Sequence, residues 1–220
     1  MGRGSSGGGG ELGNGGGRNA VIIDTTDMIS ARNADNQKEV DDVLTVGKNM
    51  VDKYGDIGIL NGTYQIATMG EPDASQTLAY YDPSTGALAM NSNFMNSKKI
   101  DSVYDKTVKS GYHPSRGNKS GAEAVASHEY GHALADAYGR SSGKNIDTAS
   151  KDIVTQAMKT LGQKKGSKEF ASKISGYAAE SYAECVAEAV ADVYCNGNKA
   201  HKNSTAIVNV LNSKLGKKKK

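Results

Sequence analysis

The chain has 220 residues, a length that suits one domain with tails, and its 27 lysines and arginines against 24 aspartates and glutamates give a net charge of +3. The last four residues are lysines, and without them 23 basic residues face 24 acidic ones, so we expect no specific nucleic-acid binding. No apolar run approaches the roughly 20 residues that cross a bilayer, so we also expect no membrane association.

The N-terminal segment is dominated by glycine, with ten of the 27 glycines in its first 18 residues. Such a segment buries nothing, so we expect a disordered leader at 1–19. It also lacks the apolar centre of a signal peptide. We therefore expect one domain at 20–215 and a lysine-rich tail at 216–220, in a cytoplasmic or virion-associated protein whose oligomeric state the sequence leaves open.

The body of the chain changes from strand-like to helical patterns. A first helix is predicted over 36–54, where apolar residues recur at helical spacing and Gly55 follows as a stop. Strand-like runs follow at 56–61, 63–69, 77–82 and 87–92, the last two joined by a hairpin turn, DPSTG. Further helices are predicted at 97–111, 120–138, 147–161, 167–174, 178–195 and 204–214. This order predicts the α+β class, with a small, mostly antiparallel sheet followed by a helical C-terminal half.

The two cysteines fall in one predicted helix. Cys185 and Cys195 are ten residues apart, which corresponds to about 15 Å along a helix. A disulfide would require the helix to break, because it needs Cα atoms within about 7 Å. Two reduced, buried thiols are therefore predicted.

The helix predicted at 120–138 carries the chemical signal. Ser120 and Glu123 fit a capping box, so the helix should begin there. Residues 128–132 read H-E-x-x-H, and His128 and His132, four residues apart, lie on the same helix face. Two imidazoles placed in this way can converge on one metal ion.

Glu129 lies beside the first histidine, where it can take a proton from water rather than bind the metal. The motif arises by chance in roughly one chain in a few hundred of this length, and a catalytic zinc needs a third protein ligand. The metzincin histidine, six residues after His132, is replaced by Tyr138. We do not expect His113, in a loop, or His201, in a polar linker, to be the missing ligand.

Carboxylates are better placed to complete the site. Glu180, Glu184, Glu188 and Asp192 follow one another at intervals of four residues. An exposed acidic stripe would have basic partners, but 178–195 contains no lysine or arginine. Buried carboxylates without cations need a metal or hydrogen-bond donors. One glutamate of this helix would complete a His-His-Glu site, the gluzincin arrangement, although the spacing does not decide which one.

The segment SGYAAESYAECVAEAV resembles the third-ligand region of the zinc domain of anthrax lethal factor and its relatives, including metallopeptidase-like domains of phage and prophage proteins. In that family a tyrosine precedes the ligand glutamate by seven residues, as Tyr177 precedes Glu184, within a run like E-x-x-A-E-A. The stretches AYYDPSTGALAMNS and GYHP are similar to the phage members in particular. The similarity covers about residues 60–195. Where the family often has aromatic residues after its two acids, this chain has cysteine and valines, which implies a differently packed helix.

The resemblance implies a zincin-like fold and a zinc-dependent endopeptidase that holds one Zn2+ per chain and cleaves a peptide or protein substrate. The implied metal ligands are His128, His132 and Glu184. Glu129 would be the general base, the Tyr177 hydroxyl would stabilise the oxyanion, and Glu188 would orient a ligating histidine.

Other residues have less specific expectations. The run at 87–92 would be the sheet edge that pairs with extended substrate, through residues 88–91. Tyr80, Tyr81 and Tyr138 are expected to pack rather than react, and Asp136 to be either an orienting group or a surface acid.

A second function class stays open. A phage-associated structural or accessory protein could keep the zinc-binding fold without turnover. Such a protein would need neither Glu129 nor Tyr177, so the presence of both favours catalysis.

Overall fold

The computed structural model describes residues 20–23, 33–55, 57, 60–66, 77–163 and 166–216, with backbone only for 20–23 and 60–66. The predicted leader at 1–19 lies outside these ranges, as does all of the lysine tail except residue 216. The strands are β1 (Ala20–Ile23), β2 (Leu60–Ile66), β3 (Ala79–Asp82) and β4 (Ala87–Asn91). The α-helices are α2 (Gln37–Tyr54), α3 (Ser97–Lys109), α4 (Gly121–Ser141), α5 (Ile146–Thr160), α6 (Ser167–Ser172), α7 (Tyr182–Asn196) and α8 (Lys202–Leu215).

The strands form one sheet in the order β1-β2-β4-β3. The β1–β2 and β3–β4 pairs are antiparallel, and only β2 and β4 run parallel, so the predicted mostly antiparallel sheet is confirmed. The predicted hairpin is also present, with Gly86 at the end of its turn at a φ of 71° that favours glycine.

The sheet corrects three predictions. Of the runs predicted at 56–61 and 63–69, residues 60–61 and 63–66 form one strand, because β2 continues through Gly62, and residues 56, 58–59 and 67–69 lie outside the described parts of the chain. β1 was not predicted at all. The run at 87–92 is not an edge: β4 lies between β2 and β3, and its backbone is already paired on both sides. Among the described strands, the edge on this side of the sheet is β3.

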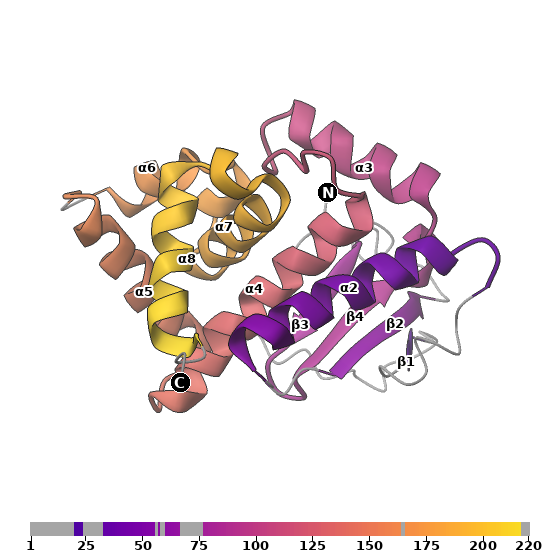
Figure 1. The fold of residues 1–220 in the computed structure, drawn as a ribbon, viewed down its shortest axis with the longest axis horizontal. Helices are drawn as coiled ribbons and strands as arrows, with labels where there is room; N and C mark the ends of the chain where they lie inside the picture. The colour runs from indigo at the N-terminus through magenta and orange to yellow at the C-terminus, as the bar shows by residue number, and fades with distance from the viewer. Residues whose placement is uncertain are drawn as a thin grey trace.

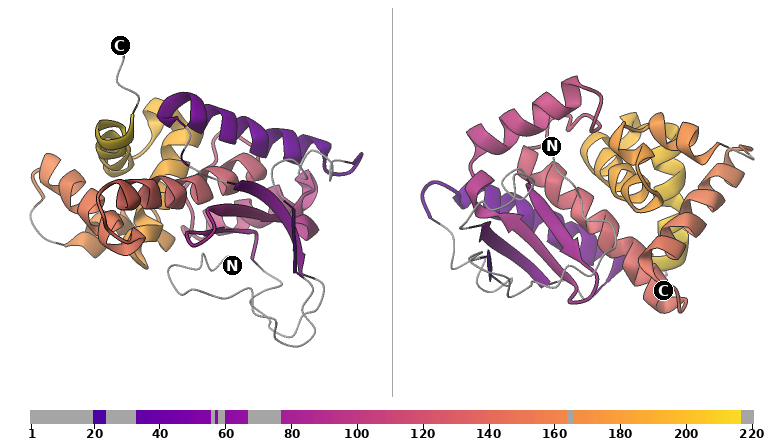
Figure 2. Two further views of the ribbon diagram at one scale, coloured as in Figure 1. Left: turned by 90° about the horizontal axis from the view of Figure 1, so that it is seen from below. Right: turned by 180° about the vertical axis from the view of Figure 1, so that it is seen from behind.

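Helix α4 is the centre of the molecule. On one side it contacts α2, α3 and β3, and on the other it contacts α5, α7 and α8. Figure 1 shows α2 running beside α4 over the sheet, with α5 to α8 grouped beyond α4, and Figure 2 shows the same two groups from below and from behind. The α+β class is therefore confirmed, with the helical C-terminal half predicted from the sequence.

The helix predicted at 178–195 begins later than expected. A short 3₁₀ turn, η3 (Tyr177–Ala179), comes first, and α7 starts only at Tyr182. Ser181 is the reason, because its side chain accepts a hydrogen bond from the Glu184 backbone N–H and caps the helix. The cysteine prediction is confirmed: Cys185 and Cys195 are both free and buried within α7.

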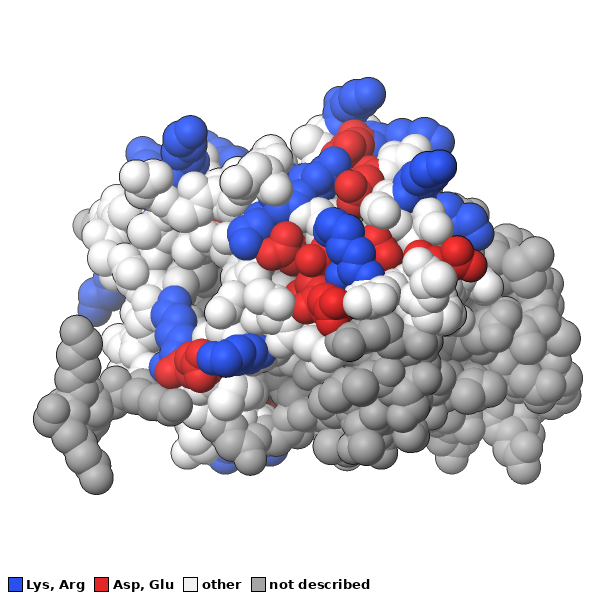
Figure 3. All heavy atoms as spheres, turned by 45° about the vertical axis from the view of Figure 1, so that its right-hand side comes forward, with Lys and Arg blue, Asp and Glu red and all other residues white. Residues whose placement is uncertain are grey.

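Charged side chains of both signs are interspersed on the face shown in Figure 3. Among the described residues, Lys119 and Arg116 in the loop before α4 pair with acids of the adjacent helices, Lys119 with Glu123 at 2.8 Å and Arg116 with Asp105 at 2.7 Å. Within the described parts of the chain, every helix is too short or too polar to cross a lipid bilayer.

Candidate metal centre

Helix α4 delivers the two histidines and Glu129 to the interior. The capping box predicted at Ser120 and Glu123 is present, so the helix starts where the sequence indicates. His128, Glu129 and His132 are 7%, 4% and 6% exposed, and each offers an atom within 4.8 Å of the others, a group that could hold a metal ion. Buried polar side chains need hydrogen-bond partners or a metal ion, and these three lie close enough together to share one ion.

Helix α7 adds the third ligand-type atom. Glu184 Oε2 lies 3.2 Å from His128 Nε2 and 3.4 Å from His132 Nε2. The two Nε2 atoms are themselves 3.2 Å apart. These three atoms form a nearly equilateral triangle. Because zinc binds nitrogen and carboxylate oxygen at about 2.0–2.2 Å, the edges of a tetrahedral ligand set are about 3.3–3.6 Å.

Unsatisfied acceptors point to the same place. Among the described residues, neither carboxylate oxygen of Glu184 accepts a hydrogen bond, although that side chain is 1% exposed. Buried acceptors without donors are rare and call for an ion or an ordered water molecule. The residues present therefore fit a bound divalent metal.

Electrostatics within the site favour ionised ligands. Burial alone would raise the pKa of Glu184, but His132 and His128 hold it far below its ordinary value. Burial alone would lower the pKa of His128, but the Glu184 and Glu188 carboxylates beside its ring raise this pKa well above 6.5. The metal-free site thus holds the anionic Glu184 and Glu188 carboxylates against the His128 imidazole, whose pKa they raise, and a metal cation would take the place of the proton that His128 attracts.

Glu129 differs from Glu184 in its surroundings. Burial raises the pKa of Glu129, the two neighbouring histidines oppose this rise, and the backbone N–H of Tyr81 donates to its carboxyl group. Its Oε2 accepts no hydrogen bond among the described residues. A carboxylate with a raised pKa and an unoccupied oxygen has the properties of a general base.

Glu188 lies behind His128, as predicted. Its Oε1 is 2.7 Å from His128 Nδ1, so this nitrogen carries the hydrogen and Nε2 is left to face Glu184. Its Oε2 accepts a hydrogen bond of 2.7 Å from the Ser175 hydroxyl. Burial alone would raise the pKa of Glu188, but His113 and His128 lower it to about 2.

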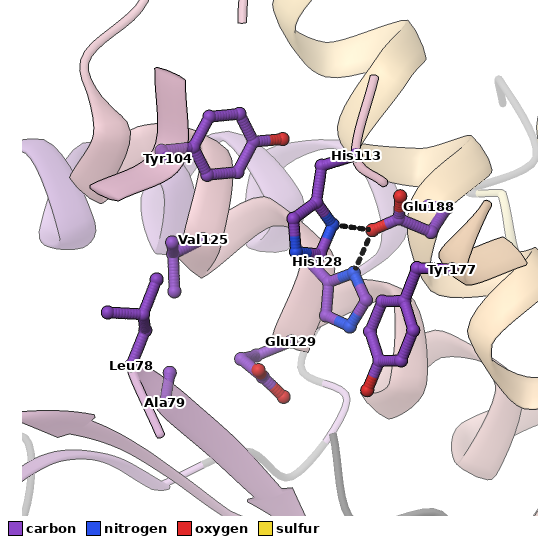
Figure 4. Close-up of a pocket in the computed structure, with 9 residues that line it drawn as sticks. All are labelled: Leu78, Ala79, Tyr104, His113, Val125, His128, Glu129, Tyr177 and Glu188. Carbon is purple, nitrogen blue, oxygen red and sulfur yellow. Dashed lines mark hydrogen bonds and ion pairs between the residues drawn. The ribbon is translucent and has the colours of Figure 1, made fainter. Parts of the chain in front are cut away.

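Tyr177 is 2% exposed and stands over the site. Its ring stacks on that of His128, with centroids 5.6 Å apart and planes at 10°, and on that of Tyr112 at 4.9 Å. Figure 4 shows its hydroxyl on the same side of His128 as the Glu129 carboxylate. The structure thus brings together all of the predicted site residues.

The other carboxylates of the predicted stripe do not reach the site. Glu180 precedes α7, is exposed, and accepts a 3.0 Å hydrogen bond from the Tyr112 hydroxyl. Asp192 accepts hydrogen bonds of 2.9 Å from the Asn196 amide and from the backbone N–H of His201. Of the four carboxylates, Glu184 is the one with an oxygen that faces the Nε2 atoms of both His128 and His132.

The remaining predicted side chains are structural. Asp136 is neither an orienting group nor a surface acid: it is 6% exposed, accepts a hydrogen bond of 2.8 Å from the Tyr81 hydroxyl, and pairs with Arg140. Tyr81 is buried, whereas Tyr80 and Tyr138 are half-buried. His201 caps α8 and lies outside the site, as expected.

A small cavity of about 30 Å³ opens beside Glu129. Its lining comprises Leu78, Ala79, Tyr104, His113, Val125, His128, Glu129, Tyr177 and Glu188 (Figure 4). The sequence predicts four of these lining residues as part of the site, His128, Glu129, Tyr177 and Glu188, and does not predict the others. Leu78 and Ala79 arrive from the start of β3, and His113 from the loop after α3.

Comparisons with known proteins add no support to this geometry and do not contradict it. No protein-family model, curated protein or solved structure matches the chain.

Proposed function

We propose that this protein is a zinc-dependent endopeptidase of the gluzincin type with a zincin-like fold. The triangle formed by His128 Nε2, His132 Nε2 and Glu184 Oε2 carries the proposal, because its edges of 3.2, 3.2 and 3.4 Å match a zinc ligand set. The similarity of the Tyr177–Glu184 spacing to the lethal factor family supports the same conclusion.

The protein groups divide the work of hydrolysis. When bound, zinc would polarise the peptide carbonyl and lower the pKa of water. Glu129 would accept a proton from the attacking water and return it to the leaving amine, a role that suits its burial and raised pKa. Tyr177 would donate its hydroxyl hydrogen to the developing oxyanion, a contribution of about 3 kcal/mol for one such donor.

Substrate backbone would pair with β3 rather than with β4. Both sides of β4 are paired, whereas β3 is at the edge among the described strands, and its first residue, Ala79, lines the cavity beside Glu129. An extended peptide added to that edge would bring its main chain to the general base. A substrate-mimic complex without main-chain hydrogen bonds to 79–82 would contradict this placement.

The first experiment is elemental analysis of the dialysed protein beside two matched variants. We expect about one zinc per chain in the wild type, no zinc in Glu184→Ala, and retained zinc in Glu180→Ala, which removes an exposed carboxylate four residues earlier. No zinc in the wild type after zinc is supplied would refute the proposal.

Hydrolysis is tested separately with a peptide library. Zinc-loaded wild type should cleave it, and Glu129→Gln should hold zinc without cleaving. A zinc-loaded wild type that cleaves no peptide would instead favour the accessory-protein function.

A further inference from the structure

His113 is placed against the site but has no role in the function proposed above. Its Nδ1 lies 2.9 Å from Glu188 Oε1, the same oxygen that His128 Nδ1 approaches at 2.7 Å. Figure 4 shows the Glu188 carboxylate between the two imidazole rings, with an interaction to each. One carboxylate oxygen of Glu188 therefore lies within hydrogen-bond distance of the Nδ1 atoms of both histidines.

The position of His113 does not suit a metal ligand. Its Nδ1 is directed at Glu188, and its ring stands 6.1 Å from that of His128, nearly perpendicular to it at 84°. The three atoms that converge on the metal position come from other residues, His128, His132 and Glu184. His113 instead contacts the site through the residue that orients a ligand.

The loop that carries His113 is held firmly to α3. The Tyr104 ring stacks on the imidazole at 5.4 Å and 13°, and the Tyr104 hydroxyl donates to the Pro114 carbonyl at 3.3 Å. Arg116 binds both oxygens of Asp105, at 2.7 and 3.0 Å. The stacked Tyr104 ring and the contacts of the residues just after His113 thus hold the imidazole in place.

The same loop is joined to the turn that carries Tyr177. The backbone N–H of Gly176 donates to the Gly111 carbonyl at 2.8 Å, and that of Tyr177 donates to the Tyr112 carbonyl at 3.0 Å. On the other side of this turn, the Ser175 hydroxyl donates to Glu188 Oε2. Glu188 is therefore held from the α3 loop through His113 and from the Tyr177 turn through Ser175.

We propose that His113 is a positioning residue: by donating its Nδ1 hydrogen to Glu188, it fixes the carboxylate that holds His128 with Nε2 toward His132 and Glu184. The inference rests on the proposed metal site. A carboxylate held only by His128 and Ser175 would keep rotational freedom, and that freedom would pass to a ligand whose position must be correct to within about 0.2 Å.

Two substitutions separate donation from packing. His113→Phe keeps an aromatic ring against Tyr104 but removes the donor, whereas His113→Asn keeps a donor near the Nδ1 position and removes the ring. Zinc affinity of the full chain is measured by competition with a chromophoric chelator, and ligand geometry by the visible absorption of the cobalt(II)-substituted protein. Thermal unfolding of each metal-free variant reports packing.

We expect His113→Phe to weaken zinc binding about tenfold, at the low end of the 10- to 100-fold range for partners of metal ligands, and to alter the cobalt spectrum. His113→Asn should stay within about threefold of the wild type, even where its metal-free protein melts lower. Wild-type affinity and spectrum in His113→Phe would overturn the proposal, as would equal losses in both variants.

A second readout does not need the metal. In the metal-free wild type, the His128 Nδ1 proton should give a slowly exchanging NMR signal because Glu188 accepts it. We expect this signal to broaden in His113→Phe and to persist in His113→Asn. If the wild type binds no metal, the proposed function fails, and this signal alone decides the role of His113: an unchanged signal in His113→Phe overturns it.

Discussion

Gly131 tests whether the spacing of two helices sets the metal site. It lies between His128 and His132 in α4, and a Cβ placed on it would be 2.6 Å from the Ala187 Cα of α7 and 3.2 Å from the Val190 Cβ. Ordinary carbon contacts are about 3.5–4.0 Å, so Gly131→Ala should push α4 and α7 apart by about 1 Å. The obstacle is backbone, which cannot turn aside as a flexible side chain can.

The stability cost of Gly131→Ala should be modest. Overpacking costs about 1–3 kcal/mol, and the better helix propensity of alanine returns about 1 kcal/mol, so a net loss of about 0–2 kcal/mol is expected. Metal binding should suffer far more, because a shift of about 1 Å between Glu184 and the α4 histidines exceeds the tolerance of about 0.2 Å for metal–ligand distances. We expect zinc affinity to fall more than about 100-fold, beyond the usual effect of outer partners.

The assay combines denaturant unfolding of the metal-free protein with zinc titration against a competing chelator. Ala133→Gly is the matched control, since it makes the reverse substitution in the same buried helix and should cost about 1 kcal/mol without a clash. It should bind zinc as the wild type does. A folded Gly131→Ala protein with zinc affinity within about threefold of the wild type would refute the reasoning, because helix spacing would then not determine ligand geometry.

Three further predictions concern the chemistry. Glu129→Gln should retain zinc and lower kcat by about 10²–10⁴-fold in a peptide assay; loss of zinc instead would make Glu129 a ligand. Tyr177→Phe should retain zinc and lower kcat about 10²–10³-fold with little change in KM, and an unchanged kcat would remove its oxyanion role. In the metal-free protein, the lowered pKa values of Glu184 and Glu188 contribute stability above about pH 4.3 that is lost as pH falls through them. The raised pKa of His128 contributes stability below about pH 6.5 that is lost as pH rises through it. In denaturant unfolding from about pH 3 to 9, Glu188→Gln should reduce the pH dependence of the free energy of unfolding at both the acidic and the alkaline end. A variant whose profile runs parallel to that of the wild type would contradict the described ionisation.

The parts that the sequence predicted are those with a local cause. The capping box at Ser120 sets the start of α4, and the intervals of four residues place His128 and His132 on one face. The late start of α7 also has a local cause, the Ser181 cap, but the alanine-rich sequence before it gives a helical pattern that hides this cap.

What could not be predicted depends on contacts between distant segments. His113 and Glu188 are 75 residues apart, and no sequence pattern predicts their 2.9 Å contact. The position of β4 within the sheet depends on its parallel pairing with β2, a non-local contact that turn residues do not encode. Gly131 reads as an ordinary small residue until Ala187 is placed against it.

The order of the ligands along the chain has a consequence for assembly during synthesis. His128 and His132 lie on α4, and Glu184 follows His132 by 52 residues, after α5 and α6. At about 5–20 residues per second, the histidine pair leaves the ribosome several seconds before the glutamate that would complete a metal site. A chain interrupted within α5 or α6 would expose two histidines without their third partner. Metal capture would therefore mark a chain in which α7 has been made and has docked on α4.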